Sequence, residues 1–98
     1  MYVDLVLCKH DKSDKLYLFT APPFSNLRKD DRVVVDTRRG KDFATVADCV
    51  PIDTNDEKYS FVLNCCGVSS PLKRVLGKFK YAEFVYKDYE KKEAENEV

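Results

Sequence analysis

The stretch DDRVVVDTRRGKDFATVADCV, residues 30–50, constrains the fold more than any other part of the chain. Two runs rich in β-branched and apolar residues, 32–37 and 42–50, flank the sequence RRGK, in which Gly40 can take a positive φ without steric cost. This pattern predicts two antiparallel strands joined by a short turn. The second run is apolar on both faces, which is typical of a strongly curved sheet or a small barrel. Asp30 precedes the hairpin where a left-handed residue is expected.

Shorter runs extend this predicted sheet on both sides. Residues 2–8 alternate in polarity, residues 16–20 are aromatic and apolar, and the polar residues 10–15 connect them. Two prolines then end the second of these strands, because proline removes a backbone donor. Residues 59–67, YSFVLNCCG, alternate again and predict another strand.

The C-terminal third allows two interpretations. In SSPLKRVLGKF, Ser70 and Pro71 are typical of the start of a short helix, whereas residues 73–79 also fit a last strand. From Tyr81 onward, apolar and aromatic residues recur every three or four positions, which predicts a helix. The charged end of the chain has few apolar anchors, so we expect it to fray.

A chain of 98 residues is long enough for one domain with a modest core. We expect an α+β fold, with a small, strongly curved antiparallel β-sheet or barrel of about five to six strands and a C-terminal helix. In this division residues 1–80 form the barrel-like domain. Residues 81–98 form the helix and its charged tail.

The segment LYLFTAPPFSNLRKDDRVVVDTRRGKDFATVADCV resembles the layout of short phage and prophage proteins of Gram-positive bacteria, whose function is mostly unknown. The ending RVLGKFKYAEFVYKDYEKKEAE resembles theirs, in which a strand leads into a helix. The first half is also similar in layout to PSP1-like and KOW-type barrels. The resemblance covers roughly residues 15–90 and implies a small barrel encoded by a mobile element. It favours a strand at 73–79, assigns no catalytic or binding residue, and differs at Asp30, where the family has a turn glycine.

The charge balance limits the classes of function. Lysine plus arginine equals aspartate plus glutamate at 17 each, so the formal net charge is zero, whereas a duplex-DNA-binding protein usually carries a basic excess. No apolar run approaches the ~18 residues of a membrane-spanning helix. The first residues lack the basic region of a signal peptide. We therefore expect a cytoplasmic protein with no membrane contact.

Candidate catalytic and metal-binding residues are few. The chain has one histidine, His10, and four cysteines, Cys8, Cys49, Cys65 and Cys66. Their spacing gives no paired zinc ligands, and we expect His10 in an exposed loop and the cysteines reduced and close to the core. Residues 53–57 lack the glycine and the closing glutamate of a calcium loop. The expectation is a non-enzyme with no metal and no cofactor.

Two groups of cations are candidate nucleic-acid contacts: Arg38, Arg39 and Lys41 on the hairpin, and Lys73, Arg74, Lys78 and Lys80 in the last predicted strand. Small barrels bind nucleic acid through loop cations and exposed aromatic rings. The alternative is that the lysines protect an edge strand against aggregation and that RRGK is only a turn. Tyr86 and Tyr89, on the predicted C-terminal helix, are candidates for self-association because a monomer would expose them.

Three hypotheses follow from these observations. The leading one is a non-catalytic phage or mobile-element protein that binds a host protein, for example to inhibit a host defence system. The second is a nucleic-acid-binding barrel that uses the two groups of cations. The third is an oligomeric sponge for a small molecule or nucleotide, with the C-terminal helix as the contact between copies.

Overall fold

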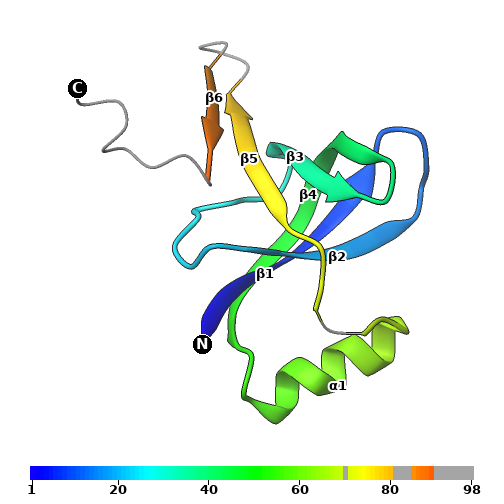
Figure 1. The fold of residues 1–98 in the computed structure, drawn as a ribbon, viewed down its shortest axis with the longest axis vertical. Coiled ribbons are helices and arrows are strands. Elements are labelled where there is room, and N and C mark those ends of the chain that lie inside the picture. The colour runs from blue at the N-terminus through cyan, green and yellow to red at the C-terminus, as the bar shows by residue number, and fades with distance from the viewer. Residues whose placement is uncertain (70, 81–84, 90–98) are drawn as a thin grey trace.

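A computed structural model describes residues 1–69, 71–80 and 85–89, and within them six strands form one antiparallel sheet. The strands are β1 Tyr2–His10, β2 Leu16–Ala21, β3 Arg32–Thr37, β4 Gly40–Asp53, β5 Val75–Lys80 and β6 Val85–Asp88. Their order in the sheet is β2-β1-β4-β3-β5-β6. Figure 1 shows the sheet curling so that β2 passes behind the start of β5. The backbone N–H of Thr20 donates to the carbonyl of Lys73 at 3.0 Å, but the sheet does not close into a barrel.

The predicted hairpin is confirmed. Thr37 pairs with Gly40 across the turn, and Gly40 has a φ of 103°. The Thr37 hydroxyl donates to the Gly40 carbonyl at 2.6 Å and accepts from the N–H of Arg39 at 3.1 Å. Asp30 has the expected left-handed conformation, with a φ of 75°. The turn therefore satisfies its own polar groups.

The main core lies inside the curl of the sheet. It consists of small and β-branched side chains from five strands and the loop after β2: Val6, Cys8, Phe19, Ala21, Leu27, Val33, Val35, Ala44, Val46 and Val75. Val46 of β4 exchanges backbone hydrogen bonds with Asp30 and Asp31, just before β3 begins at Arg32. From Asp48 onward, β4 pairs with β1 alone. This leaves one side of β4 without a strand neighbour among the described residues, and the loop of residues 22–27 lies there (Figure 1).

The predicted strand over residues 59–67 is wrong, because Glu57–Cys66 form helix α1. Asp56 caps its N-terminus by accepting from the N–H of Lys58 at 3.0 Å, and Gly67 ends it in the left-handed conformation, with a φ of 68°. Both cap residues are of types that favour helix ends, a signal that the alternation of polarity alone does not include.

The face of α1 that packs on the sheet explains the mistake. Tyr59 and Leu63 are buried together with Leu5 of β1 in a second cluster. A spacing of four residues returns to the same face in a strand and comes within about 40° of it in a helix, so these two residues fit both periods. Figure 1 shows α1 at the end of the molecule nearest the chain N-terminus. No helix among the described residues is long and apolar enough to cross a membrane.

At the C-terminal end, β5 confirms the last strand that the resemblance favoured. The predicted helix from Tyr81 is wrong for residues 85–88, which form β6 and pair with β5. The remaining residues of that prediction, 81–84 and 90–98, lie outside the described residues. A side chain at Gly77 would meet the Lys87 carbonyl oxygen at 2.5 Å and the Tyr86 ring, so the close approach of β6 to β5 requires this glycine.

Candidate binding cavity

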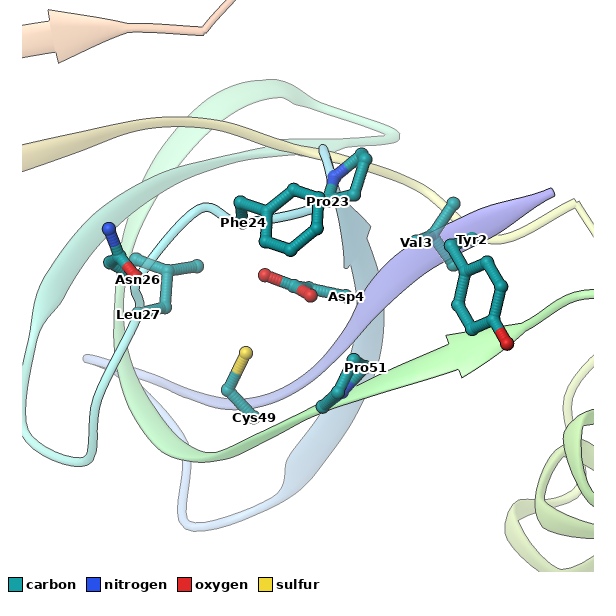
Figure 2. A pocket seen from close by; sticks show the side chains of 9 residues that line it. All are labelled: Tyr2, Val3, Asp4, Pro23, Phe24, Asn26, Leu27, Cys49 and Pro51. Atoms are coloured by element: carbon teal, nitrogen blue, oxygen red, sulfur yellow. The ribbon is translucent and has the colours of Figure 1, made fainter.

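A cavity of about 450 Å³ opens beside the part of β4 that pairs with β1 alone. Figure 2 shows the side chains that line it, which come from the start of β1, the loop of residues 22–27 and the end of β4. Most of them are apolar or aromatic, including Tyr2, Phe24 and Pro51. The volume lies in the range of about 300–1,000 Å³ that is typical of ligand sites. The cavity is therefore large enough to hold a side chain or a small molecule.

The carboxylate of Asp4 lies among these apolar side chains (Figure 2). Asp4 is only 7% exposed and is the buried charged residue of the described chain. Its Oδ2 accepts hydrogen bonds from the backbone N–H of Ser25, at 3.1 Å, and from the Ser25 hydroxyl. Its Oδ1 accepts no hydrogen bond from the described residues. One carboxylate oxygen thus holds the loop in place and the other remains available to a ligand.

The position of Asp4 follows from the alternation of β1. Asp4 shares the inner face of the strand with Val6 and Cys8, which belong to the main core. Asp4 also pairs in register with Pro51 of β4. Proline is tolerated there because β3 does not extend as far as Pro51, so that no β3 residue needs the missing N–H. The cavity is therefore the end of the core, where a carboxylate replaces the next apolar residue.

The loop of residues 22–27 has an unusual backbone. Phe24 has a φ of 62° and Asn26 a φ of 58°. Asparagine tolerates this region, but a bulky residue such as phenylalanine rarely adopts it, and each strained residue costs on the order of 1–3 kcal/mol. The strained conformation leaves the Phe24 ring 91% exposed at the rim of the cavity, while Leu27 anchors the loop in the main core. The loop thus presents a large apolar side chain to solvent.

The electrostatic environment of the cavity is negative around Cys49. Burial, together with the negative charges of Asp4, Asp48 and Asp31, raises the pKa of the Cys49 thiol to about 11. Asp31 is paired with Lys78, whose Nζ lies 2.9 Å from its carboxylate. The thiol is therefore neutral at physiological pH and is a poor nucleophile.

The structure brings Arg74 close to the hairpin cations and places Lys78 and Lys80 further along β5. Arg38, Arg39 and Lys41 are exposed on the hairpin, and Arg74 lies next to the hairpin strand, because its carbonyl accepts from the N–H of Asp36 at 2.9 Å. Lys80 is six residues from Arg74 along an extended segment, or roughly 20 Å. The other two predicted positions are Lys73, which is exposed before β5, and Lys78, which is paired with Asp31. Arg74 itself is exposed and has other interactions.

The remaining predicted residues lie apart from the cavity or in different surroundings than expected. His10 is half-buried at the end of β1 and contacts Tyr17 edge-on, with ring centroids 5.0 Å apart, so the prediction of an exposed loop histidine is wrong. Cys8 is buried and Cys49 half-buried, but Cys65 and Cys66 are exposed on α1, so the prediction of near-core cysteines is wrong for these two. The described residues contain no group of three or more side chains that could hold a metal ion.

The two tyrosines predicted for self-association belong to the C-terminal strand and the residue after it. Tyr86 lies in β6 with its ring over Gly77. Tyr89 packs against the main core, and its buried hydroxyl has no hydrogen-bond partner among the described residues. Burial raises the Tyr89 pKa to about 12, and the nearby charges of Asp31 and other groups act in the same direction. Whether these tyrosines mediate self-association stays a prediction.

Sequence reasoning missed the two residues that distinguish the cavity. Asp4 stood in a row of otherwise apolar or aromatic residues on one face of a predicted strand, which is a detectable signal for a buried carboxylate. Phe24 gave no such signal, because its positive φ depends on the folded loop. Comparison with protein family models, curated proteins and solved structures finds no match to this chain.

Proposed function

We propose that this protein is a non-catalytic binding protein that acts through a protein partner, and that the cavity around Asp4 is its contact surface. The observation that carries this proposal is the exposed Phe24, held at a φ of 62° at the rim of a cavity with a buried carboxylate. Backbone strain of this kind clusters at ligand-binding surfaces. Exposed aromatic rings next to a pocket are typical anchors of protein interfaces.

The composition of the rim supports a protein rather than a small molecule as the main ligand. Tyr2 is 63% exposed, and with Phe24 and Pro23 it extends the apolar surface outside the cavity. Aromatic residues are enriched at the centres of protein interfaces, and charged residues are depleted there. The setting in a phage or mobile element, and the inhibition of a host defence system, rest on the sequence resemblance alone and remain part of the proposal.

The test is a quantitative capture of the partner from a host lysate, after nuclease treatment, by the wild-type protein and two variants. Phe24→Ala removes the exposed ring of the cavity rim. Phe61→Ala removes a phenylalanine that is 68% exposed on α1 and serves as the matched control. We expect Phe24→Ala to abolish capture of a discrete protein and Phe61→Ala to retain it. Equal capture by both variants would contradict the proposal.

A second candidate function is the binding of single-stranded nucleic acid at the hairpin end of the sheet. The observation in its favour is the hydrogen bond from Asp36 to Arg74, which brings the cations of the hairpin and of the β5 segment to one edge. Such binding would fall steeply with salt, because it depends on phosphate neutralisation. The double variant Lys73→Glu with Arg74→Glu should then weaken binding to all sequences alike. Unchanged binding would exclude this candidate.

A further inference from the structure

The cavity has an acceptor that lacks a donor. Both hydrogen bonds of Asp4 come from Ser25 and reach Oδ2, while Oδ1 accepts none from the described residues. An ionised carboxylate can only accept hydrogen bonds, and burying one is unfavourable unless donors or an opposite charge compensate it. An occupant that brings a positively charged donor to Oδ1 would supply both a hydrogen bond and an opposite charge.

The surroundings of Asp4 favour a cation over a neutral donor. The Asp4 carboxylate is the one charged side chain among the nine residues that line the cavity, so no cation of the lining compensates it. Water is displaced from the cavity when the apolar rim is covered, which strengthens the attraction between a buried cation and the carboxylate. The charge complementarity therefore points to a positively charged group of the partner.

The shape of the lining distinguishes between the two basic side chains. Phe24 and Tyr2 offer aromatic rings, and Pro23 and Pro51 offer flat apolar surfaces. A guanidinium group is planar, stacks on such surfaces and is more weakly hydrated than an ammonium group. Arginine fits this combination better.

We propose that the cavity binds an arginine side chain of the partner protein, which passes between the Phe24 and Tyr2 rings and donates to Oδ1 of Asp4. This inference rests on the proposed function, because it names the residue by which a protein partner is held. Arginine is also among the residues that dominate binding energy at the centres of interfaces.

The direct test uses N-acetyl-arginine amide as the probe and N-acetyl-citrulline amide as its neutral isostere. Both are titrated into the ¹⁵N-labelled protein, and the amide signals of Asp4, Asn26 and Cys49 are followed. We expect the arginine compound to shift these signals in a saturable manner and the citrulline compound to bind at least about tenfold more weakly. Equal binding of the two compounds, or stronger binding of N-acetyl-lysine amide, would overturn the assignment of arginine.

Two variants tie the effect to Asp4. Asp4→Asn retains a carbonyl oxygen for Ser25 and places its NH₂ group toward the cavity, so we expect arginine binding to be lost. Pro51→Lys provides a tethered cation opposite Asp4 in the strand register and should weaken arginine binding much more than Pro51→Gln, which alters the same apolar surface without adding a charge. If Pro51→Lys and Pro51→Gln bind the arginine compound equally, the proposal is wrong even where Asp4→Asn fails to fold.

The same variants separate this inference from the proposed function. In the capture of the partner, loss with Phe24→Ala but not with Asp4→Asn would leave the protein-binding function standing and reject the arginine. Capture unaffected by either variant would reject the function itself. Loss with both variants, with stronger capture by Pro51→Gln than by Pro51→Lys, is the result that we expect.

Discussion

The hairpin turn of residues 37–40 and the loop of residues 22–27 both contain left-handed backbone, but they differ in the type of residue that adopts it. The hairpin places it on Gly40, where a side chain would meet nothing within 4 Å and where the turn satisfies its own polar groups. The loop places it on Phe24 and Asn26 and depends on a buried carboxylate for its anchoring. The hairpin is explained by the geometry of a turn alone. Turn geometry does not explain the loop, whose strained residue Phe24 lies at the rim of the cavity. This difference supports the proposal that the cavity is the contact surface.

The surroundings of the charged residues differ between the hairpin and the cavity. RRGK is the most conspicuous cluster of cations in the sequence, yet its exposed side chains follow from the needs of a tight turn. Asp4 is a single acidic residue among many, but it is buried and therefore needs hydrogen-bond partners or an opposite charge. Buried polar groups require partners, so their location carries more information than a count of surface charges.

The largest expected effect on stability comes from removing the anchor of the loop. Asp4→Ala leaves the N–H and hydroxyl of Ser25 without their acceptor, and we expect a loss of about 2 kcal/mol in the free energy of unfolding. Thr37→Ala removes two hydrogen bonds from the exposed hairpin turn and should cost less than about 1 kcal/mol. Urea denaturation of both variants measures the difference. Equal losses would mean that the two turns depend on their side chains to the same degree.

Exchanging the left-handed residues should give effects of opposite sign. Phe24→Gly relieves the strained φ and gives up little buried surface, so we expect a gain of about 1 kcal/mol in stability. Gly40→Ala forces a Cβ into a φ of 103° and should lose about 1–2 kcal/mol. Thermal unfolding of the two variants is the measurement. A loss of stability in Phe24→Gly would show that the Phe24 conformation is not strained.

The cavity side contains a titratable thiol, and the hairpin turn contains none. The pKa of Cys49 is raised to about 11 from a reference value of 9.0, so the unfolded chain releases this proton first as the pH rises. Stability from this group is therefore complete below pH 9 and is lost between pH 9 and about 11. The free energy of unfolding should fall by less than the roughly 1.4 kcal/mol per pH unit that a fully shielded group would give, because Cys49 is only half-buried.

The measurement is the free energy of unfolding from pH 8 to 10.5 for the wild type, Cys49→Ala and Cys65→Ala. Buried Cys8, whose pKa is raised to about 12, contributes a decline of the same sign in all three proteins. We expect a shallower decline in Cys49→Ala, and the wild-type decline in Cys65→Ala, since Cys65 is exposed on α1. Identical slopes in all three proteins would contradict the shielding of Cys49.

The smallest effect is expected at the hairpin cations. Arg38→Gln with Arg39→Gln changes only exposed side chains at the turn, so the stability should move by less than about 0.5 kcal/mol. Capture of the protein partner should be unchanged. If this double variant lost capture while Phe24→Ala retained it, the contact surface would lie at the hairpin and not at the cavity.

Local signals predicted much of the sheet, and long-range packing decided the rest. The β3–β4 hairpin followed from β-branched runs around Gly40, because turn and pattern agree there. The strand predicted for residues 59–67 is helix α1 instead, because Tyr59 and Leu63 fit both periods and the caps at Asp56 and Gly67 favour the helix. Residues 85–88 carried a helical spacing but pair with β5, where backbone hydrogen bonds to a neighbouring strand override a weak periodicity.

The cavity was beyond sequence reasoning for a different reason. Asp4 and Ser25 are 21 residues apart, and their contact arises only when β1 lies beside β2 and the following loop. The exposed ring of Phe24 likewise depends on a backbone conformation that no local preference favours. The polarity pattern of β1 could have identified Asp4 as a buried acid, but not its partners.

The central claim is that the cavity, and not the hairpin, contacts the partner. Amide hydrogen exchange of the protein, alone and with the captured partner bound, tests this most directly. We predict new protection at residues 2–4, 24–27 and 48–50, with residues 37–41 and 73–74 unchanged. Protection centred on the hairpin and the start of β5, with the cavity segments unaffected, would contradict the account.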